Sequence, residues 1–147
     1  MKKQNEVIDN LIETLKDGQQ GFKEAAESVK NPQLKSLFND YSQQRARFIV
    51  ELRSKAQSPN KRDPDISGSA TGALHRGWIN LKSALSRCDD HAILAECERG
   101  EDSAVEEYQT ALDNGLSAPV RDIVSRQYIE IEATHDRIRD LRDATKG

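Results

Sequence analysis

Residues 90–119 read DHAILAECERGEDSAVEEYQTALDNGLSAP, and their pattern indicates the class of fold. Its apolar side chains recur every three or four positions, at Leu94, Cys97, Ala104, Tyr108 and Leu112. That spacing places them on one face of an α-helix. Gly115 suits the end of this helix, and Pro119 suits the first turn of the next one. The stretch therefore predicts an amphipathic helix over 90–114, followed by a short turn into another helix.

The remainder of the chain shows the same helical spacing, without the sustained two-residue alternation that indicates a strand. The spacing predicts four further helices, over 4–30, 32–57, 70–87 and 118–144. Asn31 and Pro32 suit the N-cap and the first helical position of the second helix. Pro59 and Pro64 lie in a segment with the composition of a linker.

Together these elements predict an all-α fold, a four-helix bundle in which residues 1–147 form a single domain. Short turns make an antiparallel hairpin of residues 4–57 and a second one of residues 90–144. The connection between the hairpins, residues 58–88, is long and holds the linker and the extra short helix. A long crossover between the second and third long helices is the ferritin-like arrangement of such a bundle.

Composition excludes several classes of protein. The chain has 147 residues, of which 35% are hydrophobic and 32% charged, and its net charge is −3. No apolar run approaches the roughly 18 residues of a membrane span, and no apolar stretch follows Met1 as in a secretory signal. The two cysteines, Cys88 and Cys97, suit a reducing compartment. We therefore expect a cytoplasmic protein whose partners include neither a membrane nor nucleic acid.

Charge is unevenly distributed along the chain. Residues 91–114 carry seven acids and one base, whereas residues 32–57 carry five bases and two acids. Opposite charges of this kind favour pairing between neighbouring helices, or between one copy and another. Because the apolar stripes are narrow, a second copy would complete the core. We expect a homodimer.

A metal site in this kind of bundle takes one Glu from each of two helices and a Glu-x-x-His from each of the other two. Glu132 and His135 form one literal Glu-x-x-His, and Glu101 lies on the inner stripe of its helix. The second Glu-x-x-His is missing, and the helical period turns Asp17 and Glu24 away from the core. Glu101, Glu132 and His135 are therefore candidate ligands of an incomplete site for iron or zinc.

The other interpretation of Glu101 is a buried ion pair. Arg45 falls at the middle of its helix and leans towards the core, and a buried carboxylate needs a charged or hydrogen-bonding partner. The pair would form a buried polar layer, extended by Gln44, Tyr41 or His135. Such a layer fixes the register of the helices more than it adds stability. This interpretation requires no cofactor.

Four further residues call for a functional or a structural interpretation. His75 and Trp78 would form an exposed recognition patch, or Trp78 would pack the short helix onto the bundle. Cys97 lies on an apolar stripe and reads as a core thiol. Cys88, at a helix end, is a candidate for a redox role.

Five motifs resemble a bacterial family of ferritin-like four-helix-bundle proteins of unknown function. They are KDGQQGF at 16–22, QQRARF at 43–48, GALHRGW at 72–78, AECERGED at 95–102 and HDRIRDL at 135–141. The resemblance implies a ferritin-like bundle in a bacterial cytoplasm and no established activity. The sequence thus favours a non-catalytic protein that acts by interaction or self-assembly. The alternative is a metal-binding, iron-handling carboxylate protein.

Overall fold

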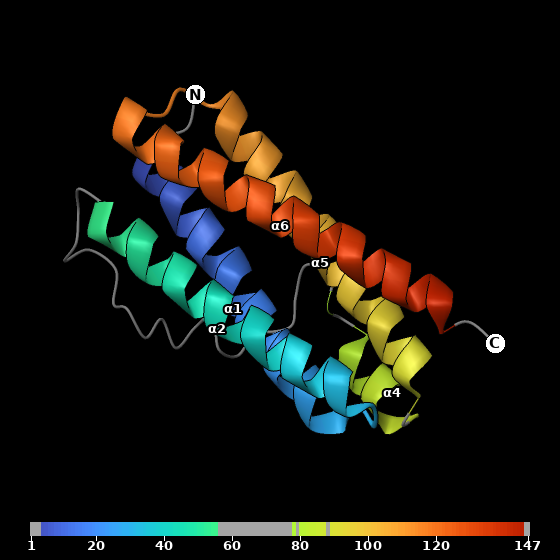
Figure 1. Cartoon of the computed structure of the whole chain (residues 1–147). Coiled ribbons are helices and arrows are strands. Elements are labelled where there is room, and N and C mark those ends of the chain that lie inside the picture. The colour runs from blue at the N-terminus through green and yellow to red at the C-terminus, as the bar shows by residue number, and fades with distance from the viewer. Residues whose placement is uncertain (1–3, 56–77, 79, 88, 146–147) are drawn as a thin grey trace.

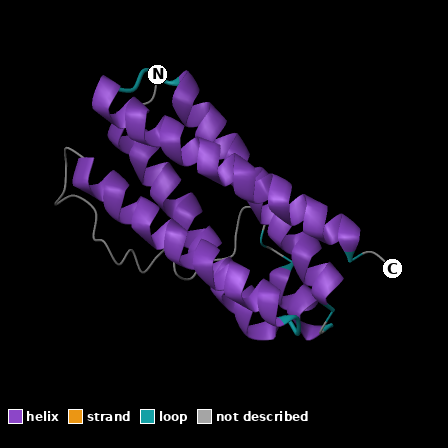
Figure 2. Cartoon of the chain, in the orientation of Figure 1, coloured by secondary structure: helices purple, strands orange, loops and turns teal. Residues whose placement is uncertain are grey.

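The computed structural model describes residues 4–55, 78, 80–87 and 89–145. These residues form five helices and, within the described ranges, no strand (Figure 2). The helices are α1 (Gln4–Ser28), α2 (Pro32–Lys55), α4 (Leu81–Ser86), α5 (Asp90–Asp113) and α6 (Ala118–Ala144). The prediction of an all-α fold with four long helices is confirmed.

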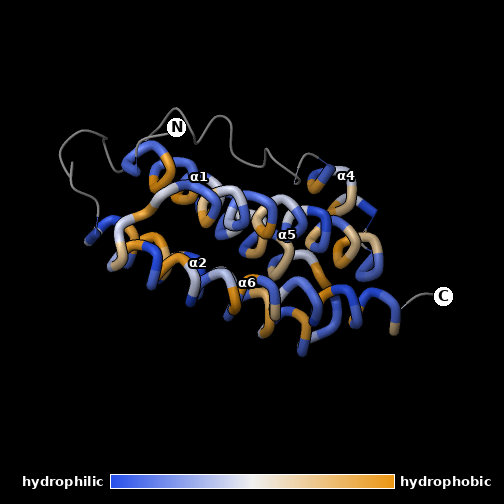
Figure 3. The backbone as a smooth tube through the Cα atoms, turned by 90° about the horizontal axis from the view of Figure 1, so that it is seen from above, coloured by the Kyte–Doolittle hydropathy of each residue, from blue (hydrophilic) through white to orange (hydrophobic). Residues whose placement is uncertain are grey.

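The four long helices pack as two antiparallel hairpins laid side by side (Figure 1). Within the hairpins α1 packs on α2 and α5 on α6, and between them α1 packs on α5 and α2 on α6. The short helix α4 packs on α5 and also touches α1. Blue and orange segments alternate along each long helix in Figure 3, as expected for amphipathic helices with one buried face.

Local sequence signals set the helix boundaries. The side chain of Asn31 accepts hydrogen bonds from the backbone N–H groups of Gln33 and Leu34, at 2.7 and 3.3 Å, which caps α2. Pro32 occupies the first helical position, as predicted. The carboxylate of Asp90 accepts from the N–H groups of Lys30 and Asn31, so the start of α5 is tied to the turn between α1 and α2.

Two apolar clusters form the core, one towards each end of the hairpins. The first contains Ile8, Leu11, Leu15, Leu52, Ile131 and their neighbours. The second contains Phe22, Phe38, Trp78, Leu94, Ile138 and their neighbours. Buried polar side chains separate the two clusters, and they include the candidate layer of Arg45 and Glu101.

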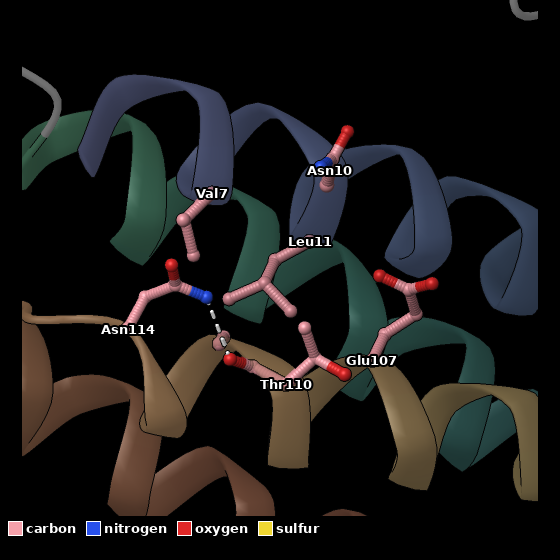
Figure 4. A pocket seen from close by; sticks show the side chains of 7 residues that line it. Val7, Asn10, Leu11, Glu107, Thr110 and Asn114 are labelled. Atoms are coloured by element: carbon pink, nitrogen blue, oxygen red, sulfur yellow. Dashed lines mark hydrogen bonds between the residues drawn. The ribbon is translucent and has the colours of Figure 1, made fainter. Parts of the chain in front are cut away.

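The antiparallel packing of α1 on α5 leaves a small surface pocket (Figure 4). It lies where the first turns of α1, at Val7 and Leu11, meet the last turns of α5, at Thr110 and Asn114. Its volume is about 20 Å³, which holds no more than about one water molecule. The side chain of Asn114 donates a hydrogen bond to the carbonyl of Thr110, which caps this end of α5.

Two details of the sequence prediction are wrong. Trp78 is not helical: in the described residues the short helix begins at Leu81, and residues 58–77 lie outside the described part of the chain. Asp17 is only 5% exposed, although the helical period turns it from the predicted inner face. The reason is that α1 packs against α2, α4 and α5, so more than one of its faces is covered.

Among the described helices, none combines the length and the apolar character that crossing a membrane requires.

Candidate functional site

The middle of α2 and the middle of α5 are joined by a buried ion pair. Nη1 of Arg45 donates to Oε2 of Glu101, and Nη2 donates to Oε1, both at 2.8 Å. Each side chain is 1% exposed. Two parallel bonds between a guanidinium and a carboxylate are the strongest geometry that this pair can adopt. The structure thus brings together Arg45 at the middle of α2 and Glu101 on the inner face of α5.

Neighbouring groups complete the shell of the Arg45 guanidinium. Nε donates to the side-chain oxygen of Gln44 at 3.0 Å. The ring of Phe22 lies beneath the guanidinium, with 5.4 Å between its centroid and Cζ, a cation–π contact. Gly18 lies next to the guanidinium, where a Cβ would be 3.5 Å from Nη1, an ordinary contact. All three guanidinium nitrogens therefore have a partner.

Tyr41 lies at the edge of this layer. Its ring packs on Phe22, with 5.3 Å between the centroids. Burial raises the pKa of the Tyr41 hydroxyl, and the charge of Arg137 partly opposes that rise. Gln44 and Tyr41 thus both border the pair, but only Gln44 is hydrogen-bonded to Arg45 in the structure.

A second buried polar group was missed in the sequence. The hydroxyl of Tyr108 donates to Oε1 of Gln127 at 2.6 Å, and both residues have no exposed surface. The amide of Gln127 donates in turn to the carbonyl of Phe48 and to Glu51, at 3.3 and 2.9 Å. Burial raises the pKa of Tyr108 far above its usual range. The signal was present, because Gln127 falls between Val124 and Ile131 at helical spacing.

The three candidate metal ligands do not converge. Both carboxylate oxygens of Glu101 accept from Arg45. Glu132 is exposed, 3.4 Å from the hydroxyl of Tyr128 on its own helix. His135 faces other residues of α5. The donor set at the centre therefore does not fit the metal site of a ferritin-like protein, since its inner carboxylate already has a cation as its partner.

His135 belongs instead to a cluster at the surface between α5 and α6. Its Nε2 lies 2.6 Å from Oδ1 of Asp102 and 3.8 Å from Oε2 of Glu98. Its Nδ1 lies 3.1 Å from Oδ1 of Asp136, the next residue. Burial lowers the pKa of His135, but the hydrogen bonds to Asp136 and Asp102 and the nearby charges outweigh it, so the pKa is raised.

Residues 3–114 match the family described as "Domain of unknown function (DUF2383)". The chain belongs to the DUF2383 family. Among curated proteins, none matches the sequence significantly.

The DUF2383 match spans α1, α2, α4 and α5 and ends before α6. It therefore includes both members of the Arg45–Glu101 pair, as well as Glu98 and Asp102, but it does not include His135. The family description names no function, so the function of this chain must be argued from its own side chains.

The matched region also contains a tryptophan clamped between two glycines. Trp78 is 2% exposed, which excludes it as an exposed recognition residue, whereas His75 lies outside the described residues. The indole lies against Gly21 of α1 and Gly100 of α5, and a Cβ at either glycine would overlap its atoms. The ring of Phe22 meets it edge-on at 5.2 Å. The side chain of Trp78 thus packs onto the two long helices α1 and α5.

The cysteines offer no reactive group in the described part of the chain. Cys97 is fully buried, and burial raises the pKa of its thiol well above the usual range, so it is a core residue. Cys88 lies outside the described residues.

Proposed function

We propose that this chain is a ferritin-like four-helix bundle, without a catalytic centre and without a cofactor in its central layer, that acts by self-assembly as a homodimer in a bacterial cytoplasm. The order of helix contacts supports the ferritin-like arrangement. Each long helix packs on its hairpin partner and on one helix of the other hairpin, and a long connection joins α2 to α5. These are the features that a ferritin-like crossover produces.

The observation that carries self-assembly is an apolar groove between the first turns of α2 and the last turns of α6. Its volume is about 250 Å³. The apolar residues in its lining are Leu34, Leu37, Leu141 and Ala144. A groove of this kind gives a partner apolar surface to cover.

The charges beside the groove favour a second copy as the partner. Asp40 of α2 and Arg137 of α6 both line it, and both are exposed. A two-fold axis presents the same patch on both copies, so that residue i of one meets residue j of the other. Asp40 of each copy would then face Arg137 of its partner. One face with one charge of each sign is complementary to itself.

The buried layer supports a structural role for the centre of the bundle. Arg45 and Glu101 satisfy each other's hydrogen bonds. A buried ion pair of this kind fixes the register of the helices more than it stabilises the fold. The alternative function, iron handling through Glu101, Glu132 and His135, has weaker support. It would require Glu101 to exchange Arg45 for a metal ion and leave the guanidinium buried alone.

Charge reversal across the groove tests the proposal. We expect sedimentation equilibrium to give a dimer at micromolar concentration. Asp40→Arg and Arg137→Asp should each weaken dimerisation about tenfold or more, because like charges then meet across the interface. The double variant should regain the wild-type affinity. Glu106→Arg, an equal charge change at an exposed position of α5, is the matched control.

Two results would contradict the proposal. One is a wild-type protein that remains monomeric throughout the micromolar range. The other is a dimer whose affinity responds equally to Asp40→Arg and to the Glu106→Arg control, since this would move the interface away from the groove.

A further inference from the structure

We propose that Glu98, Asp102 and His135 form a site for one divalent transition-metal ion on the surface between α5 and α6. This site is separate from the central layer and independent of the proposed self-assembly. One oxygen of each carboxylate and one ring nitrogen of the histidine lie within 4.8 Å of one another.

The two helices bring these groups together through simple register. Glu98 and Asp102 are one turn apart on α5 and therefore share a face. His135 of α6 lies opposite, with Nε2 at 2.6 Å from Asp102 and 3.8 Å from Glu98. Metal–ligand bonds of about 2.1 Å place ligand atoms about 3.4 Å apart in a tetrahedral site. The two His135 distances lie on either side of that value, so small rotations of the Asp102 and Glu98 side chains would bring them to it.

Asp136 provides a second observation that points to a metal ligand. Its carboxylate lies 3.1 Å from Nδ1 of His135, on the side of the ring away from Glu98 and Asp102. A histidine that binds a metal usually donates its other N–H to a carboxylate, which fixes the ring and the tautomer. Before an ion binds, Nε2–H donates to Asp102. When an ion binds, that proton leaves, and the lone pair of Nε2 then faces both carboxylates of α5.

Arg142 leaves the inner oxygen of Glu98 available. Its Nη1 contacts Oε1 of Glu98, whereas Oε2 is the oxygen that faces His135. Arg142 therefore orients Glu98 rather than closing the site, although its charge lowers the affinity for a cation. Glu98 and His135 are largely covered, while Asp102 is 58% exposed and leaves a path for the ion from solvent.

The donor set selects the class of ion. One imidazole nitrogen and two carboxylate oxygens suit zinc, iron(II) or manganese(II), whereas magnesium and calcium take oxygen ligands only. Three protein ligands leave at least one position for water. Binding needs the neutral imidazole, so it releases a proton and strengthens as the pH rises.

Titration of chelator-treated protein with zinc chloride, followed by calorimetry and by ¹⁵N spectra of the histidine side chains, tests the site. We expect one ion per chain and a shift of the His135 Nε2 resonance. Asp102→Asn and Glu98→Gln should each weaken zinc binding about tenfold or more, with unchanged circular dichroism. His91→Gln and Asp140→Asn, at exposed or partly exposed positions of the same two helices, are matched controls that should bind as the wild type does.

Adventitious binding has a different signature. If Asp102→Asn and Glu98→Gln bind zinc as tightly as the wild type, or if His91→Gln weakens binding as much as they do, the site is wrong. The Asp40→Arg variant separates the two proposals. It should lose dimerisation and keep one zinc ion per chain, since all three ligands come from one copy.

Discussion

Two neighbouring carboxylates of α5 have opposite surroundings. The side chain of Glu101 is 1% exposed and accepts both of its hydrogen bonds from Arg45, a cation that never loses its charge. Asp102, the next residue, is 58% exposed and meets His135, whose charge depends on pH. Successive residues of a helix are rotated by about 100° around its axis. Glu101 therefore points into the core as part of a fixed ion pair, whereas Asp102 points to the surface, where it can exchange partners.

Burial, more than residue type, determines the role of these two carboxylates. In the central layer, removing the charge of Glu101 or of Arg45 leaves the other charge buried without a partner, which is costly. At the surface, solvent and neighbouring side chains compensate for the loss of the Asp102 carboxylate. The two regions should therefore differ most in the energetic cost of removing one carboxylate.

The largest expected effect comes from Glu101→Gln. Breaking a buried pair by removing one partner typically costs about 3–5 kcal/mol, so the free energy of unfolding should fall by that order. Arg45→Met in the same chain should restore much of the loss, because no buried charge then remains. Urea unfolding of both single variants and the double variant measures the coupling.

Asp102→Asn is the matched control for that experiment, because it makes the same chemical change one residue away. It should alter the free energy of unfolding by less than about 1 kcal/mol. A coupling near zero between Arg45 and Glu101, or equal losses from Glu101→Gln and Asp102→Asn, would show that burial does not make the Glu101 carboxylate costlier to remove.

Gly100 and Gly18 differ in the space that each leaves for a Cβ atom, and this difference should have a smaller effect on stability. Gly100 stands between Glu98 and Glu101, and a Cβ there would overlap the indole of Trp78. Overpacking of this kind costs about 1–3 kcal/mol. A Cβ at Gly18 would instead lie 3.5 Å from Nη1 of Arg45, an ordinary contact.

Gly100→Ala should therefore lower the thermal midpoint, whereas Gly18→Ala should raise it. The gain at Gly18 comes from helix propensity, which favours alanine over glycine by about 0.8–1 kcal/mol. Differential scanning calorimetry distinguishes the two directions. A destabilised Gly18→Ala would mean that the space around the Arg45 guanidinium is tighter than the structure indicates.

Much of the fold could be predicted because helix signals are local. The apolar period and the Asn31–Pro32 start depend only on nearby residues, and they place the long helices within about two residues of their observed ends. The proximity of Arg45 and Glu101 followed from counting turns along two helices. The start of the short helix was not predictable in this way, because the position of Trp78 is determined by glycines from α1 and α5.

The surface cluster was missed for a related reason. A search for Glu-x-x-His on one helix pairs His135 with Glu132, which the structure turns to solvent. The partners of His135 come from the other helix of the hairpin. The available signal was the spacing of Glu98 and Asp102, two acids one turn apart at the level of His135.

The burial of Asp17 could not be predicted from its own helix either, since it depends on how many helices surround α1.

The smallest expected effect is a pH dependence that belongs to the surface cluster. The folded-state pKa of His135 is raised above its ordinary value of about 6.5. The folded protein therefore binds the proton more tightly than the unfolded chain does. This contribution to stability is fully present below about pH 6.5 and is lost as the pH rises through the raised folded-state pKa.

Urea unfolding of the wild type should accordingly show a loss of less than about 1 kcal/mol between about pH 6 and pH 9, because the cluster is partly exposed. The variant His135→Gln should lack this slope, and Asp102→Asn should reduce it, since its carboxylate is one of the two that hydrogen-bond the imidazole. His91→Gln, the control at a second histidine of α5, should keep it. A slope that survives His135→Gln would assign the pH dependence elsewhere. A slope of opposite sign would mean that burial, which lowers the pKa of His135, prevails over its acidic neighbours.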